Sequence, residues 1–259
     1  MIAAPPLGSG RMATVDIIVP CYNEAERLDA SAFVAFCAAV PDVQLHLVDD
    51  GSTDDTATVI QQLAAARPNR ITATSLPANM GKAGAVRAGL QQAIAAGASR
   101  VGYWDADLAT PLDAIPRLNA ILDRRPEIEI VLGSRVQLLG RRITRNPLRH
   151  YGGRVFATFA SMVLRMPVYD TQCGAKIFRV TPLLDAALRD PFETGWTFDV
   201  ELLARLADLR VEGGLSALEA VTYEYPLEQW DDVEGSAVRA VDFPIALGHL
   251  ARIWRGRRT

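Results

Sequence analysis

The stretch GYWDADLATP, residues 102–111, joins a strand pattern to a helix pattern through a short acidic segment. The apolar run over residues 101–104 predicts a buried strand, and a helical pattern follows the proline. Two interpretations fit the acids between them. Asp107 or Thr110 could cap the helix. Alternatively, because residues i and i+2 of an extended chain point the same way, Asp105 and Asp107 could face one site and hold a divalent cation such as Mg²⁺.

Composition and charge limit the classes of protein to consider. The chain has 259 residues, of which 49% are hydrophobic and 22% are charged, enough for one large domain or two small ones. A net charge of -3 and a pI near 5.7 argue against a general nucleic-acid binder. Three scattered cysteines without a CxxC pair indicate a reducing compartment and argue against a disulfide framework or structural zinc. No uninterrupted apolar run approaches the roughly 20 residues of a membrane-spanning helix.

Short strands and helices alternate through the first half of the chain. The predicted strands are residues 15–20, 43–48, 71–75, 101–104 and 128–132, and the predicted helices between them are residues 24–40, 53–66, 82–96 and 112–124. This alternation predicts an α/β fold, with a single mostly parallel central sheet and helices on both faces.

The regular alternation stops after Ser134. The pattern there predicts helices at residues 146–164, 196–207 and 238–255, a strand at 218–223, and a loop with a hairpin over 168–179. We therefore expect a flexible leader at residues 1–14, one domain over 15–236, and a C-terminal amphipathic helix with a basic tail at 237–259. The second half would add a basic helical region beside the sheet.

Three of the predicted strands end in polar clusters, namely VPCYNE, VDDGSTD and WDAD. Ligands of open α/β sheets bind beyond the carboxyl ends of the strands. Three such clusters at strand ends indicate one shared site rather than three independent helix caps. This convergence favours the cation interpretation of Asp105 and Asp107.

Eight motifs follow one another along most of the chain: VPCYNEAERL, VDDGSTDDT, NMGKAGAVRAGL, DADLATP, GSR, DTQCGAKIFR, WTFDVELL and EGS. In this order they resemble family 2 glycosyltransferases, and most of all the branch of dolichyl-phosphate β-glucosyltransferases and dolichyl-phosphate mannose synthases. The resemblance implies a GT-A fold, Mg²⁺ or Mn²⁺, and inversion at the anomeric carbon. It implies transfer of a hexose to a polyprenyl phosphate, from UDP-glucose in the first place and GDP-mannose next.

The resemblance also assigns residues to the donor. The predicted nucleotide-sugar contacts are Pro20, Tyr22, Glu24, Asp49, Asp50, Lys82, Asp105 and Asp107. We expect Asp107 to ligate the metal directly, with Asp105 on the ribose or the metal. Two local alternatives need no ligand: Asn23 and Glu26 could form a capping box for the next helix, and Asp50 could only orient the GST turn.

The predicted acceptor side is strongly basic. No acid lies between Glu129 and Asp170, and that span contains Arg135, Arg141, Arg142, Arg145, Arg149, Arg154 and Arg165. An ordinary basic surface over an amphipathic helix would account for several of them. The functional interpretation is an anion site around Arg135, beside a basic, partly apolar face for anionic lipid. By resemblance, the acceptor or phosphate contacts are Arg135, Gln172, Lys176 and Ser236.

Asp199, in WTFDVELL, leaves the class of acceptor open. In related enzymes that act on hydroxyls, an acid at the start of this helix is the general base, whereas a phosphate acceptor is already ionised and needs none. We expect Asp107, Asp199 and Arg135 to be catalytic. The alternatives are transfer to a hydroxyl of a lipid, glycan or small molecule, and an inactive sugar-nucleotide binding module. The expected location is cytoplasmic, peripheral on the inner face of the plasma membrane.

One position departs from the family pattern. Relatives commonly read GSK where this chain reads Gly235-Ser236-Ala237. The lysine of that motif helps to hold the donor diphosphate in a closing loop. Ala237 therefore predicts a weaker closing contact, for which Arg239 is a candidate replacement.

Overall fold

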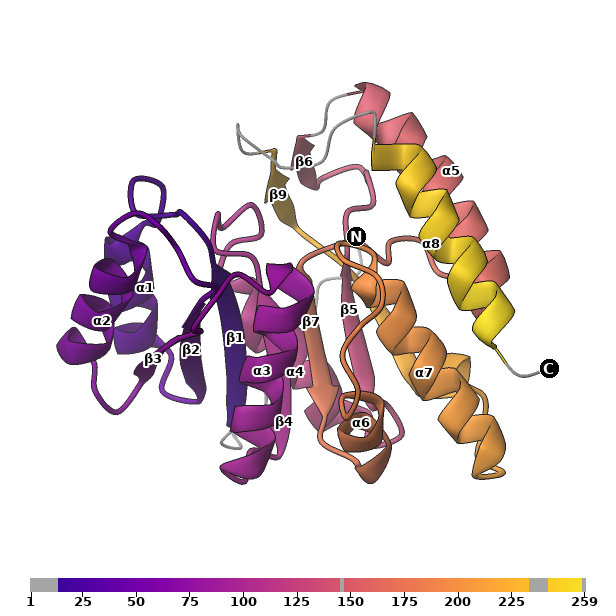
Figure 1. Cartoon of the computed structure of the whole chain (residues 1–259), viewed down its shortest axis with the longest axis horizontal. Helices are drawn as coiled ribbons and strands as arrows, with labels where there is room; N and C mark the ends of the chain where they lie inside the picture. The colour runs from indigo at the N-terminus through magenta and orange to yellow at the C-terminus, as the bar shows by residue number, and fades with distance from the viewer. Residues whose placement is uncertain (1–13, 145–146, 233–241, 258–259) are drawn as a thin grey trace.

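A seven-stranded sheet forms the centre of the molecule (Figure 1), in the order β3-β2-β1-β4-β7-β5-β8. The structure is a computed structural model, and it describes residues 14–144, 147–232 and 242–257. Neighbouring strands are parallel, except that β7 runs antiparallel to both β4 and β5. The strands are β1 (Val15–Cys21), β2 (Val43–Asp49), β3 (Ile71–Ser75), β4 (Arg100–Trp104), β5 (Ile130–Ser134), β7 (Ala175–Arg179) and β8 (Thr222–Pro226). The prediction of one mostly parallel sheet is confirmed.

Helices cover both faces of the sheet, as predicted. One face packs against α1 (Ala30–Ala39), α2 (Thr56–Ala66) and α4 (Ala114–Arg124), and the other against α3 (Gly81–Ala95), α6 (Pro182–Ala187) and α7 (Phe198–Glu212). Alternate strand residues enter the two cores. Ile18 and Tyr103 lie on the α3 side, whereas Ile17 and Trp104 lie on the α1 side.

Two helices and a small second sheet lie outside the central sheet. Helices α5 (Pro147–Leu164) and α8 (Asp242–Gly256) lie side by side beyond α7 (Figure 1). A small parallel sheet joins β6 (Arg142–Thr144) to β9 (Gln229–Asp231). No helix in the described ranges is both long and apolar enough to cross a membrane.

The first helix begins later than its pattern predicts. It starts at Ala30, where Asp29 accepts a hydrogen bond from the Ala32 amide at 3.0 Å. Asn23 instead adopts a positive φ of 53° and accepts a hydrogen bond from the Thr53 amide at 2.9 Å. The capping-box interpretation of residues 23–26 is therefore wrong, because Asn23 joins two loops of the site.

The chain between residues 168 and 179 does not form the predicted hairpin. This segment contains one strand, β7, which lies between β4 and β5. Both of these neighbours precede β7 by many residues in the sequence. The strand predicted at residues 218–223 is a 3₁₀ turn, η1 (Leu218–Val221), followed by β8. Residues 1–13 and 233–241, with Ser236, Ala237 and Arg239, lie outside the described residues, so the domain boundaries remain a prediction.

Candidate active site

Loops at the carboxyl ends of β1 and β2 are joined by direct hydrogen bonds. Pro20 is the penultimate residue of β1, and the Cys21 carbonyl accepts from the Asp50 amide at 2.8 Å. The Asn23 amide donates to Ser52 Oγ at 3.0 Å. The first two polar clusters of the sequence therefore form one continuous surface.

Asp50 holds the loop that leads into α3. Its carboxylate accepts a hydrogen bond from the Met80 amide at 2.8 Å, and burial raises its pKa. Gly51 has a φ of 65°, and a Cβ there would lie 2.7 Å from the Ala78 carbonyl carbon, so only glycine fits. The structure places the Asp50 carboxylate on the loop that carries Lys82, and not on the GST turn.

The remaining donor candidates border the same surface. Asp49 is buried, and it is this carboxylate that accepts from the Ser52 amide, at 3.0 Å. Tyr22 is exposed. The Oε2 atom of Glu24 is buried without a hydrogen bond to the described residues, 3.6 Å from Arg27 Nε. Burial raises the pKa of Glu24 despite this arginine, so the carboxylate can accept hydrogen bonds from a ligand.

Asp105 and Asp107 differ sharply in their electrostatic surroundings. Burial alone would raise the pKa of Asp105. Lys82 Nζ lies 2.5 Å from Asp105 Oδ1, and its charge and hydrogen bond, together with the charges of Lys176 and Arg135, lower that pKa instead. Asp107 accepts a hydrogen bond from the Ala109 amide at 3.0 Å and has no ion pair with any described residue. Burial, and then the charge of Asp105, raise its pKa. Asp107 is thus a carboxylate that an added cation would stabilise.

Gly174 fixes the position of the Asp105 side chain. Its carbonyl accepts from the Asp105 amide at 3.1 Å, and a Cβ at Gly174 would overlap the Asp105 carboxylate. The loop before β7 therefore closes directly over this acid.

We expect Gly174→Ala to lower transfer activity about 100-fold, because a methyl group would displace the Asp105 carboxylate by about 1 Å. Gly248→Ala in α8 is the matched control, since a Cβ there meets no atom within 4 Å. Steady-state rates and thermal unfolding of both variants check the prediction. Equal rates for the two variants would contradict it.

Asp199 lies in a buried polar cluster at the start of α7. Lys176 Nζ is 2.5 Å from Asp199 Oδ1, and the hydroxyl of Tyr103 donates to the same oxygen. Lys176 also donates to the Cys173 carbonyl at 2.5 Å, and its side chain is only 1% exposed. The ammonium of Lys176 is thus buried against Asp199 and Cys173, and its contact with the acceptor stays a prediction.

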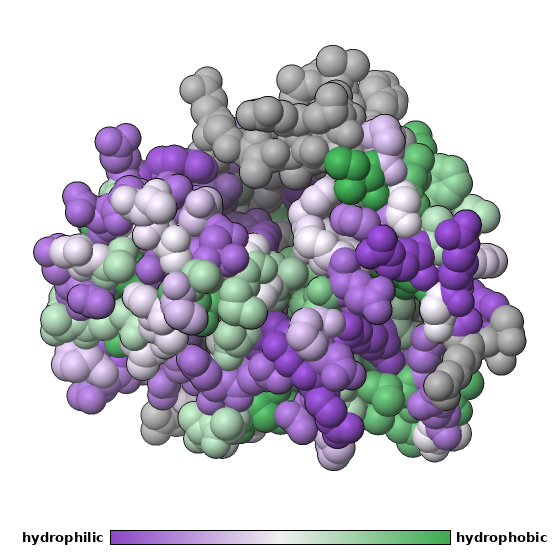
Figure 2. All heavy atoms as spheres, in the orientation of Figure 1, coloured by the Kyte–Doolittle hydropathy of each residue, from purple (hydrophilic) through white to green (hydrophobic). Residues whose placement is uncertain are grey.

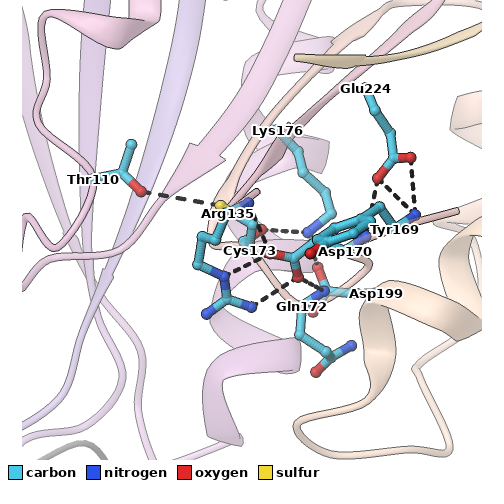
Figure 3. Close-up of polar contacts among 9 residues, drawn as sticks. All are labelled: Thr110, Arg135, Tyr169, Asp170, Gln172, Cys173, Lys176, Asp199 and Glu224. Atoms are coloured by element: carbon cyan, nitrogen blue, oxygen red, sulfur yellow. Dashed lines mark hydrogen bonds and ion pairs between the residues drawn. The ribbon is translucent and has the colours of Figure 1, made fainter. Parts of the chain in front are cut away.

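Arg135 is held by an acid that the sequence interpretation did not select (Figure 3). Its Nε and Nη2 atoms donate to the two carboxylate oxygens of Asp170 at 2.6 and 2.8 Å, and its amide donates to the same group at 3.1 Å. Asp170 raises the pKa of Arg135 further above its usual range, so the guanidinium stays charged. The positive charge of the predicted anion site is therefore partly neutralised by the carboxylate of Asp170.

Gln172 is the remaining acceptor candidate in the described residues. Its amide N–H donates to Asp170 at 3.1 Å, while its side chain points away from that carboxylate (Figure 3). The Nε2 atom is buried and makes no hydrogen bond within the described ranges. A buried donor without a partner costs about 1–3 kcal/mol, so Gln172 is suited to bind a ligand oxygen.

Sequence reasoning missed Asp170, Gly174, Glu224 and Trp230. The first two stand inside the quoted motif DTQCGAKIFR, where the unbroken polar run was the available signal. Glu224 and Trp230 have no local signal, because their partners lie more than 50 residues away in the sequence.

The mostly parallel sheet with its antiparallel β7 and the acidic strand end after β4 are the arrangement of a GT-A fold. The chain belongs to glycosyl transferase family 2, whose family model matches residues 16–185.

Several proteins of known function are similar over most of their length. A dolichyl-phosphate beta-glucosyltransferase of Trichomonas vaginalis is 29% identical, over 98% of this chain and 77% of the relative. A polyprenol monophosphomannose synthase of Mycolicibacterium smegmatis is 27% identical, over 93% and 89%. The glucosyl-3-phosphoglycerate synthase of Mycobacterium tuberculosis, solved with Mn²⁺, UDP and its product, superimposes with a TM-score of 0.63 at 18% identity, over 94% and 80%.

Proposed function

We propose that this enzyme transfers a hexose, glucose in preference to mannose, from a nucleoside-diphosphate sugar to a polyprenyl phosphate at a membrane surface, with inversion. The observation that carries the proposal is that one loop, residues 170–174, contacts both Arg135 and Asp105. Asp170 accepts from the Arg135 guanidinium at 2.6 and 2.8 Å, and the Gly174 carbonyl accepts from the Asp105 amide at 3.1 Å. The acidic donor side, at Asp105, and the cationic acceptor side, at Arg135, thus lie next to each other beyond the sheet. The lipid-phosphate specificity of the similar glucosyl- and mannosyltransferases supports the same acceptor.

The residues present fit a divalent metal ion. Asp107 is a carboxylate without an ion pair among the described residues, and the charge of Asp105 raises its pKa. Oxygen ligands of this kind, completed by a substrate diphosphate, suit Mg²⁺ or Mn²⁺. Asp107 would hold the ion, with Asp105 beside it. When bound, the metal stabilises the negative charge of the departing diphosphate.

The chain's own residues account for the other requirements of the reaction. Lys82, at the first turn of α3, is positioned by Asp50 and Asp105 to contact the donor phosphates. The acceptor phosphate oxygen forms a bond to the anomeric carbon from the side opposite the nucleoside diphosphate, which leaves with the electron pair. That oxygen is already anionic at neutral pH, since the second pKa of a phosphate monoester is about 6. Arg135 attracts and orients it.

Transfer to a hydroxyl is the second candidate function. It requires Asp199 to accept a proton. In this structure, Oδ1 of Asp199 already accepts from Tyr103 and Lys176, and the side chain is 6% exposed. This arrangement favours a structural and orienting role, so the phosphate acceptor remains the better proposal.

A donor and acceptor panel tests the function. Purified protein is incubated with UDP-glucose, UDP-galactose, GDP-mannose or GDP-glucose, with Mn²⁺, and with either a polyprenyl phosphate or the corresponding polyprenol. Mass spectrometry of the lipid is the readout. We expect glucosyl transfer to the phosphate only. Product from the polyprenol alone would establish the hydroxyl alternative, and failure to transfer or hydrolyse any donor would favour a binding module.

The outer helices α5 and α8 support peripheral attachment to a membrane. Their exposed apolar side chains are Val155, Phe159, Met162, Ile245 and Trp254. Exposed arginines at positions 165, 252 and 255 flank them. Figure 2 shows hydrophobic residues at the upper right of the view, over α5 and α8. An apolar strip with basic flanks is the pattern of a helix that lies in an anionic membrane surface.

Binding to anionic vesicles should decrease with salt. Each basic residue near an anionic surface contributes about 1 kcal/mol, and salt screens that attraction. We expect co-sedimentation with phosphatidylserine-containing vesicles at 50 mM salt to fall several-fold at 500 mM, and Arg252→Glu/Arg255→Glu to bind weakly at both. Asp185→Asn, on the remote helix α6, is the control. Absence of binding at low salt would refute the attachment.

A further inference from the structure

The Arg135 guanidinium lies over the ring of Trp230. The Arg135 Cζ atom lies 5.2 Å from the centre of the Trp230 ring. Asp170 meanwhile occupies the edge formed by Nε and Nη2. The guanidinium is thus restrained by two groups, a carboxylate at one edge and the indole ring over which its Cζ atom lies.

Within the described ranges, the remaining edge of Arg135 has no protein partner. Within the described part of the chain, Nη1 makes no hydrogen bond, and the side chain is 14% exposed. Asp170, which binds Arg135, and Gly174, which binds the Asp105 amide, stand in one loop, so Arg135 lies beside the site beyond β4. Asp170 and Trp230 together therefore determine where the N–H groups of Arg135 Nη1 point.

The carboxylate that holds Arg135 is itself supported by β8. Glu224 accepts hydrogen bonds from the Tyr169 amide at 2.8 Å and from the Asp170 amide at 2.9 Å (Figure 3). Burial raises the pKa of Glu224. A buried carboxylate on two successive backbone amides fixes the chain at residues 169–170, and with it the acid that binds Arg135.

Trp230 is also connected to the turn that contains Asp107 and Ala109. Its strand, β9, continues into Asp231, whose amide donates to the Ala109 carbonyl at 3.0 Å. The Ala109 amide donates to Asp107 at 3.0 Å. A continuous chain of contacts therefore runs from the Asp107 carboxylate through Ala109 and β9 to Trp230 and Arg135.

We propose that Trp230 and Glu224 are positioning residues: together they set the orientation of Arg135 relative to the Asp107 turn, and so align the acceptor anion with the donor. The inference rests on the proposed function for the identity of that anion. Neither residue is expected to touch the substrate, because each acts through Arg135 or Asp170.

The test is a double-mutant cycle between Trp230 and Arg135. We expect Trp230→Leu to lower kcat/KM for the acceptor roughly tenfold while leaving the Kd for UDP or GDP unchanged, and Trp230→Phe to restore most of the loss. In an Arg135→Ala background, Trp230→Leu should cause no further decrease. Gln229→Ala, on the same strand with its side chain on Asp231, is the matched control. If Trp230→Leu lowers kcat/KM by the same factor in the wild type and in the Arg135→Ala background, the proposal is overturned.

A second measurement does not depend on substrate. The Nε–H NMR resonance of Arg135, assigned by its disappearance in Arg135→Lys, should be sharp in the wild type. It should broaden or shift in Trp230→Leu and in Glu224→Gln, and stay unchanged in Gln229→Ala. An unaltered resonance in both positioning variants would overturn the proposal, whatever the acceptor. If the wild type instead glycosylates only a hydroxyl, the proposed function fails while the cycle, measured on that acceptor, still decides the role of Trp230.

Discussion

Replacement of Asp107 by asparagine should remove at least 99% of transfer activity and leave the fold intact. Loss of residues that merely support metal ligands typically costs 10–100-fold, so loss of the ligand itself is expected to exceed about 100-fold. Asparagine retains an oxygen for the Ala109 amide, 3.0 Å from the present carboxylate. Steady-state rates across a Mn²⁺ titration, with thermal unfolding measured alongside, check both parts of the prediction.

The direction of the change in stability caused by Asp107→Asn follows from the pKa of Asp107. The pKa of Asp107 is raised in the folded protein, so its ionised form is less favourable there than in the unfolded chain. At pH 7 the ionised group therefore lowers stability, and the neutral amide should leave the melting temperature unchanged or slightly higher. Asp113→Asn, at a largely exposed position nearby, is the control for rate. Full activity of folded Asp107→Asn, or of wild type in EDTA, would rule out the metal assignment.

Asp199→Asn is expected to destabilise the protein by about 3–5 kcal/mol, the usual cost of leaving one partner of a buried ion pair without its counter-charge. The charge left behind is the ammonium of Lys176, 1% exposed and 2.5 Å from Asp199. A Lys176→Met/Asp199→Asn double variant should recover most of this loss, because it removes both charges. Urea unfolding of the two variants and the wild type gives the comparison. Single and double variants of equal stability would contradict this account.

The same variant distinguishes the two acceptors once activity is expressed per folded molecule. With a phosphate acceptor, Asp199→Asn should lower kcat only several-fold, through disturbed positioning of Lys176 and Tyr103. With a hydroxyl acceptor, loss of a general base should cost about 100-fold or more. A 100-fold decrease at unchanged donor affinity would make the hydroxyl acceptor the better interpretation.

Local pattern was sufficient for the first half of the fold. Strands such as β1 and β4 are short apolar runs that end in polar residues, so their positions and the shared edge of the sheet could be predicted. The start of α1 could not, because Asn23 is paired with Thr53, and periodicity contains no information about such a contact. For the same reason, nothing in the run AKIFR indicated that β7 would lie between β4 and β5.

The candidate site was predictable to a similar extent. The apolar run of β4 predicts that Asp105 and Asp107 follow a strand end, but Asp107 lies in a turn, so the alternation of an extended chain does not describe their arrangement. The position of Arg135 at the end of β5 follows from its motif. Its partner Asp170 lies 35 residues further along, so the ion pair depends on the tertiary fold. Lys176 was assigned to the acceptor by resemblance alone. The structure pairs its ammonium with Asp199, 23 residues further along, and such a contact also depends on the tertiary fold.

The late position of β7 in the chain has a consequence for synthesis on the ribosome. The strand begins at Ala175, some seventy residues after β4 ends, yet it is the neighbour that completes the middle of the sheet. At about 5–20 residues per second, the nascent chain carries β4 with one unpaired edge for several seconds. During that time Asp105 lacks the carbonyl of Gly174 that accepts from its amide. The donor half of the enzyme can therefore collapse early, but it acquires its working geometry only after the acceptor half has begun to emerge.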